Sequence, residues 1–367
     1  MKKLFNIALL LTVIAAFAQV DMFNRKVTAT GRGEVNPEHK TMAQKRFGAL
    51  KAAEASALRS IIEQINGMPI DANTVVRDLA LESDVIKTET EGIAKYFEIV
   101  GGPRYMDDGS VELDIELSLN NLDWAGKVVQ AVGVGSGKNR SLALRAAEVD
   151  AKRQLLERVK GMYLAASTLI KDGSVEGDVI DIKTQGVLRN ATMVKGSEKY
   201  MDDNSVEVIC EVKLGDDLQT VPGFSSVLMK DMDFDEEYPI VPQATYKLSD
   251  VVKDEVFTGL IVDCTGVNLV PALAPKIFSA SGKEVYGSSM VSQSYATQQG
   301  MIGYDRKIEN ARSNPRVANN PLVIKATGVK GTNKVNIVIS DEDAAKIESA
   351  AKQLKFLGEC KVMAIVK

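Results

Sequence analysis

Two related stretches decide the fold: ALKAAEASALRSIIEQINGM at residues 49–68 and ALRAAEVDAKRQLLERVKGM at residues 143–162. Ten of their twenty aligned positions are identical. In both stretches the apolar residues recur every three or four positions, which is the spacing of one face of an amphipathic helix. Gly67 and Gly161 indicate that both helices end near these glycines. The apolar lines are Leu50, Ala53, Ala57, Ile61, Ile65 and Met68 in the first stretch and Leu144, Ala147, Ala151, Leu155, Val159 and Met162 in the second.

A second pair of matching stretches follows in the same order. YMDDGSVELDIELSL at residues 105–119 and YMDDNSVEVICEVKL at residues 200–214 are identical at nine of fifteen positions. Their alternating apolar and polar residues predict a half-buried strand, and Asp108-Gly109 and Asp203-Asn204 predict a hairpin turn before it. A short glycine-containing strand precedes each helix. Each copy is therefore expected to form a β-α-β-β unit, with one helix on an antiparallel sheet.

The residues after the second copy predict a further domain of α+β type. Ser340 and Asp343 form a capping box for a helix that is expected to run to about Leu357. Residues Ser288–Asn320 are polar and have no regular period, so we expect a functional segment or an interface there. The predicted strands are Leu260–Cys264, Lys276–Ser279, Glu284–Tyr286, Leu322–Ala326, Val335–Ile339 and Cys360–Val366.

The start of the chain predicts export. Lys2 and Lys3 precede a mostly apolar run of about 14 residues, shorter than the roughly 20 that a membrane-spanning helix needs. Ala16-Phe17-Ala18 has the small-x-small pattern of a signal-peptidase site, so we expect cleavage after Ala18. The expected division is a signal peptide at 1–18, a first repeat at 22–122, a second repeat at 123–215, an acidic, proline-containing linker at 216–243, and a C-terminal α+β domain at 244–367.

The composition of the chain argues against several classes of function. Apolar residues make up 45% and charged residues 26%, and the net charge is −4, so no basic surface for nucleic acid is expected. His39 is the single histidine in the sequence, which excludes a multi-histidine metal centre. The three cysteines do not form a disulfide framework, and whether Cys264 and Cys360 pair stays open. We expect no enzyme activity and no catalytic, cofactor-binding or metal-binding residue.

Some short motifs resemble known sites and fail at diagnostic positions. Gly133–Lys138 resembles a phosphate loop, but Val132 and Asn139 stand where glycine and serine or threonine are required. The Tyr-Met-Asp-Asp sequence resembles a polymerase metal hairpin, but it recurs in both copies, where a turn explains it.

Two further features are read as structural. Asp231, Asp233 and Asp235 begin like a calcium loop, but Glu236 and Pro242 replace the glycine and glutamate that such a loop needs. We therefore expect a solvated acidic linker there. His39 is expected to lie exposed in the loop before the first long helix.

The duplicated unit resembles the LPP-type outer-membrane lipoprotein family. The resemblance covers about residues 27–214 and is carried by the Gly-x-Gly strand, the alanine-rich helix ending in Gly-Met and the alternating hairpin. Similar units occur in the basal-disk lipoprotein of polar flagella and in a flagellar ring-assembly protein. The third domain, with GLIVD at 259–263, PALAP at 271–275 and NPLVIK at 320–325, is similar to the carboxy-terminal part of bacterial envelope proteins that carry such units. A lipobox cysteine is missing, so no direct lipid anchor is expected.

The resemblance implies a protein of the bacterial cell envelope. We expect it in the periplasm or on the periplasmic face of the outer membrane, acting in protein–protein assembly, as in a flagellar or other envelope ring. Its expected partners are envelope proteins or further copies of itself, bound through edge strands and the Ser288–Asn320 region. The alternative is a binding module whose C-terminal domain holds a glycan, peptide or small ligand. A pocket lined by Tyr286, Tyr295 and Tyr304 would favour that alternative.

Overall fold

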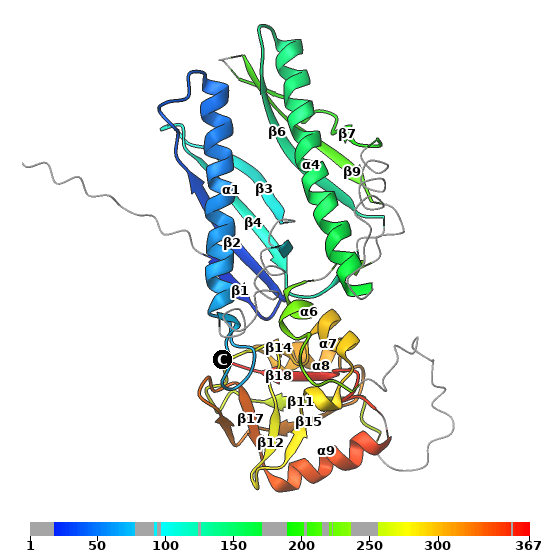
Figure 1. Cartoon of the computed structure of the whole chain (residues 1–367). Coiled ribbons are helices and arrows are strands. Elements are labelled where there is room, and N and C mark those ends of the chain that lie inside the picture. Colours follow the sequence, from blue (N-terminus) through cyan, green and yellow to red (C-terminus); the bar gives the residue numbers. More distant parts are fainter. Residues whose placement is uncertain are drawn as a thin grey trace, which may run out of the picture.

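The structure is a computed structural model. It describes residues 18–77, 92–93, 97–123, 126–170, 189–201, 204–214, 220–221, 223–235, 256–353 and 355–367. The fold is of the α+β class, which confirms the prediction from the sequence. Figure 1 shows two units side by side, each with one long helix on a sheet, and a third domain at one end of them.

The first repeat is a four-stranded antiparallel sheet covered by one helix. Its sheet order is β1-β2-β4-β3, and its helix begins with a capping box between Thr41 and Gln44. The predicted apolar line of the helix is buried against the sheet, with Leu50, Ile61 and Ile65 fully buried. The elements are β1 (Ala18–Asp21), β2 (Lys26–Gly33), α1 (Met42–Asn66), β3 (Glu98–Tyr105) and β4 (Val111–Ser118).

The second repeat has the same order of elements and a sheet in the order β6-β9-β7, with β8 also paired to β9. Each repeat interrupts its hairpin at the same place: Gly101 in β3 and Gly196 between β7 and β8 have positive φ angles, of 74° and 80°. The elements are β6 (Val128–Ser136), α4 (Arg140–Ile170), β7 (Thr192–Met193), β8 (Lys199–Tyr200) and β9 (Ser205–Lys213).

Helix α4 corrects one expectation. It was expected to end at Gly161 and runs on to Ile170, whereas α1 ends at Asn66 with Gly67 as its cap. The following residues explain the difference. Pro69 comes two residues after Gly67 and cannot continue a helix, while Met162 to Ile170 contain no proline or glycine.

Strand glycines allow each helix to lie close to its sheet. A Cβ atom at Gly31 would overlap the carbonyl oxygen of Ala53, and one at Gly133 would overlap that of Ala147. The helix residues at these contacts are alanines, so backbone lies almost directly on backbone. This close packing is repeated at equivalent positions of both copies.

The C-terminal domain combines two sheets. One is parallel, in the order β14-β18-β11-β15, and the other is mixed, in the order β13-β12-β17-β16. Asp343 N–H donates to Ser340 Oγ, which confirms the predicted cap of the last helix. The strands are β11 (Gly259–Asp263), β12 (Ile277–Ser279), β13 (Glu284–Tyr286), β14 (Gly303–Asp305), β15 (Pro321–Lys325), β16 (Gly328–Lys330), β17 (Asn336–Ile339) and β18 (Val362–Ile365). The helices are the short 3-10 helix η3 (Ser288–Met290), α7 (Gln293–Gln299), α8 (Ile308–Ser313) and α9 (Asp341–Gln353).

Parts of residues 216–243 pack into the fold. β10 (Thr220–Val221) pairs with β5 (Leu122–Asp123), and α6 (Phe224–Leu228) is buried at every position. Ser225 N–H donates to the Leu119 carbonyl at 2.7 Å, which fixes α6 to the end of the first repeat. Within the described residues, the helices are all too short or too polar to cross a membrane.

Candidate functional site

The contact between the two repeats, here called the seam, is centred on a buried carboxylate. Glu207 of β9 is 2% exposed, accepts a hydrogen bond from the Tyr105 hydroxyl of the first repeat and pairs with Lys199 at 2.8 Å. Burial and the adjacent Glu207 raise the pKa of the Tyr105 phenol. The guanidinium of Arg46 in α1 donates to Ser205 Oγ at 2.9 Å. The seam is therefore closed by specific polar contacts at the hairpin end of both repeats.

A second part of the seam surrounds Arg158 of α4. Its guanidinium lies 4.5 Å from the centre of the Phe97 ring of the first repeat, and burial lowers its pKa. Glu54 of α1 is also buried, forms an ion pair with Lys51 at 2.7 Å and lies close enough to Arg158 to stabilise its charge. A buried cation is thus placed between an aromatic face and a carboxylate of the other repeat.

Side chains of α4 also form hydrogen bonds with backbone groups of β6, on the edge of this strand that lies away from β9. Gln154 donates to the Val132 carbonyl at 2.7 Å, Arg158 donates to the Gln130 carbonyl at 2.7 Å, and Asp150 accepts from the Val134 N–H. In the first repeat the equivalent helix positions are Ser56, Ser60 and Gln64, and the equivalent strand β2 is paired with β1 instead. The backbone groups at this edge are therefore hydrogen-bonded by helix side chains in the second repeat and by the neighbouring strand β1 in the first.

The joint between the first repeat and the C-terminal domain is built around Arg25. This residue lies in the β1–β2 turn with a φ of 55° and is 7% exposed. It donates to Asn120 Oδ1 at 3.0 Å and to Ser225 Oγ at 3.1 Å, and Gly300 lies against its guanidinium. Among the described residues its Nη1 atom has no hydrogen-bond partner, and burial lowers the pKa of Arg25 to about 10.

A second arginine, the partly buried Arg316, lies close to Arg25. It donates to the Cys360 carbonyl at 2.7 Å, to the Gln299 carbonyl at 2.8 Å and to the Gly300 carbonyl. It therefore caps the C-terminal end of α7, where backbone carbonyls favour a positive charge. Asn121 N–H also donates to the Thr297 carbonyl, so residues 288–320 form an interface inside the chain.

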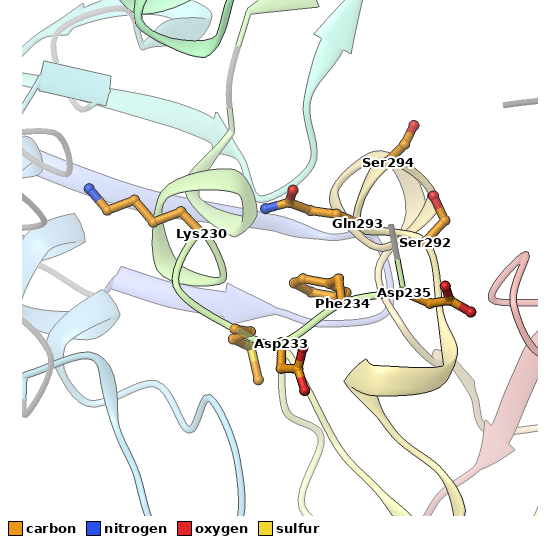
Figure 2. Close-up of a pocket in the computed structure, with 8 residues that line it drawn as sticks. Lys230, Asp233, Phe234, Asp235, Ser292, Gln293 and Ser294 are labelled. Atoms are coloured by element: carbon orange, nitrogen blue, oxygen red, sulfur yellow. The ribbon is translucent and has the colours of Figure 1, made fainter. Parts of the chain in front are cut away.

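A polar pocket of about 430 Å³ lies beside this joint. Figure 2 shows the Phe234 ring between the Lys230 side chain on one side and Ser292 and Ser294 on the other. Asp233 and Asp235, two of the three aspartates that begin like a calcium loop, also line it. Within the described part of the chain, no three acidic, histidine or cysteine side chains converge in a way that would hold a metal ion.

The tyrosines that would favour ligand binding do not gather in this pocket. Tyr286 and Tyr304 are buried, and their hydroxyls donate to the carbonyls of Met301 and Ala272. Tyr295 is partly buried and packs on the core. The geometry of these three residues therefore does not supply an open aromatic surface for a glycan or peptide.

The other residues examined in the sequence have structural surroundings. Gly133 and Gly135 face the backbone of α4, and Gly109 and Asn204, with φ angles of 82° and 62°, form the hairpin turns. Asp202 and Asp203 lie outside the described residues. His39 differs from its expected exposed position, because its ring packs on Gly48. The cysteines Cys210, Cys264 and Cys360 are free and buried.

Residues 259–367 match a protein family described as the second domain of Treponema pallidum Tp0624. The match covers the C-terminal domain and neither repeat. No curated protein matches the chain.

Proposed function

We propose that this chain is an exported, non-enzymatic protein of the bacterial cell envelope that acts in protein–protein assembly. The signal-like start and the resemblance of the repeats to envelope lipoproteins support this location. A flagellar or other envelope ring is the setting that the resemblance favours. The periplasm or the periplasmic face of the outer membrane is the proposed compartment.

The observation that carries the proposal is the continuity of the core. One cluster of buried apolar residues extends from Met22 in the first repeat through Leu155 in α4 to Val366 at the end of the C-terminal domain. Hydrogen bonds also cross the seam between the two repeats and the joint around Arg25. Such a chain holds its surfaces at fixed distances, which is what an assembly subunit requires.

Exposed apolar side chains gather on the second repeat and support the same proposal. Large apolar residues at the surface of a soluble protein are concentrated where partners bind. Among the described residues, five of the eight exposed large apolar side chains belong to this repeat: Val128, Leu142, Val149, Leu156 and Tyr200, with exposed fractions between 37% and 61%.

Fractionation and cross-linking in cells test this function. We expect the chain in the periplasmic or outer-membrane fraction, without its first 18 residues, and in cross-linked species heavier than one copy. A photoreactive residue at Val149 should give these species, and one at the exposed Arg59 of α1 should not. A chain that stays in the cytoplasm, or gives no cross-linked species from either position, would contradict the proposal.

A further inference from the structure

The outer face of α4 has the spacing of a helix-pairing surface. Leu142, Ala146, Val149, Arg153 and Leu156 follow one another at intervals of four, three, four and three residues, the repeat by which two helices pack along a shared line. Leu142, Val149 and Leu156 are 51%, 61% and 37% exposed. Figure 1 shows α4 in front of its sheet, with no other labelled helix or strand drawn over it.

The first repeat provides an internal comparison. The equivalent line on α1 is Gly48, Ala52, Ala55, Arg59 and Ile62. Two of its side chains are smaller, with Gly48 in place of Leu142 and Ala55 in place of Val149, and the His39 ring covers Gly48. The second copy thus carries larger apolar residues at exposed positions of the same line, although burial within the chain does not require them.

We propose that two copies of this chain pair through this face, with their α4 helices parallel and related by a two-fold axis that runs between them. This inference rests on the proposed assembly function and specifies its first contact. In that arrangement Val149 faces Val149 of the partner copy, and Leu142 and Leu156 each face the same residue of that copy. The apolar line is therefore complementary to itself, as a two-fold contact requires.

The charges along α4 select the parallel direction. The Arg153 guanidinium is held by Asp150 at 3.0 Å and by Glu157 at 2.7 Å, so this group of three carries a net negative charge. Arg145 is exposed and makes no ion pair with any residue that the structure describes. Both carboxylates of this group lie on one flank of the apolar line, and Arg145 and Lys152 lie on the other. A parallel pair therefore places Arg145 beside Asp150 and Lys152 beside Glu157 of the other copy, whereas an antiparallel pair places Arg145 beside Lys152.

Sedimentation and light scattering of the purified exported chain test the contact. We expect a dimer in the wild type and a shift to monomer in Val149→Glu, with at least about a tenfold weaker association. Ala55→Glu, at the equivalent exposed position of α1, is the matched control and should remain a dimer. Both changes lie at exposed positions, and circular dichroism checks that each variant folds.

Two further variants test the register. Val149→Cys should form a disulfide between copies on oxidation, while Ala55→Cys should not; the native cysteines are buried and do not compete. Lys152→Glu and Glu157→Lys should each weaken the dimer, and the two changes together should restore it. A dimer that survives Val149→Glu, or a double reversal that fails to restore pairing, overturns the proposed contact.

The failure of this inference is distinct from failure of the assembly function. A wild-type monomer that is still cross-linked through position 149 to another envelope protein would overturn the dimer and leave the assembly function in place. A wild-type monomer without any cross-linked partner would overturn both.

Discussion

Tyr105 and Tyr200 occupy the same position in the two repeats, and within the described residues only Tyr105 donates a hydrogen bond to the other repeat. The Tyr105 hydroxyl donates to Glu207 across the seam, whereas Tyr200 is 46% exposed and lies beside Arg140, with 5.4 Å between the guanidinium and the ring centre. Arg46, the equivalent of Arg140, also lies close to its tyrosine and binds Ser205. An identical arginine–tyrosine pair thus joins the repeats in one copy and faces solvent in the other.

Removing the Tyr105 hydroxyl should weaken the seam. In Tyr105→Phe the buried Glu207 loses one of its two hydrogen-bonding partners, and we expect the free energy of unfolding to fall by about 1–3 kcal/mol. Tyr200→Phe is the control and should change it by less than about 0.5 kcal/mol. Urea unfolding of both variants gives the comparison. Equal effects at the two positions would show that Tyr105 does not hold the repeats together.

A methyl group at the strand glycines should separate helix from sheet. Gly31→Ala and Gly133→Ala place a Cβ atom onto the helix backbone at Ala53 and Ala147, and we expect each to cost about 3 kcal/mol of stability, as overpacked cores do. Gly67→Ala is the control, because its nearest neighbour would lie at 3.7 Å. Thermal unfolding measures the difference. If one copy tolerates the change and the other does not, the two close contacts are not equivalent.

Low pH should lower the stability of the first repeat, because it protonates Asp114 on the first sheet. Arg104, 2.6 Å from Asp114, holds the pKa of that carboxyl below its usual 3.8, and Thr30 adds a hydrogen bond. As the pH falls, the Asp114 carboxylate is therefore protonated at a higher pH in the unfolded chain than in the folded chain. The stabilisation by Asp114 is therefore complete above about pH 4 and is lost as the pH drops through the lower folded value. Thermal unfolding between pH 7 and 3 should show a shallower acid loss in Asp114→Asn and in Arg104→Gln.

The thiols should be unreactive in the folded chain. Burial raises the pKa of Cys264 to about 12 and that of Cys360 to about 11, and all three cysteines are fully buried. A thiol reagent such as DTNB should give no colour under native conditions and three equivalents after denaturation. One equivalent after denaturation would indicate that Cys264 and Cys360 are paired.

Nucleotide and magnesium should not bind to the motifs that resemble their sites. The glycines of the Gly133–Lys138 stretch face α4, so no space for a phosphate opens at them. Titration calorimetry with magnesium and ATP should give no heat of binding. A micromolar affinity that disappears in Lys138→Ala would contradict this expectation.

The repeated unit could be predicted because its signals are local. The apolar lines of both helices are buried except for the partly buried Leu144, and the inward residues of β4, such as Leu113 and Ile115, are fully buried as their alternation indicated. β1 was not predicted because four residues, AQVD, are too few for a period. α6 was missed for the same reason, since five residues give little more than one turn.

The seam could not be predicted because its contacts join residues far apart in the chain. Tyr105 and Glu207 have identical counterparts in the other copy, Tyr200 and Glu112, so identity does not reveal which pair meets. Divergence is the more useful signal. Ser56 and Ser60 become Asp150 and Gln154 in the second copy, and these longer residues reach the edge of β6.

That edge has a consequence for how such units evolve in tandem. A unit whose leading strand is paired by β1 can only stand at the start of a series, because β1 occupies the place where a preceding unit would dock. A unit that satisfies the same edge with long polar side chains from its own helix is fit for an interior position. Each copy is thus specific to its position in the chain. If their order were exchanged, the first unit would have a leading strand without a β1 partner, and the second would carry β1 where the preceding unit must dock. In longer chains of this kind, serines at these helix positions would mark the first unit, and an acid–amide pair would mark each unit that follows another.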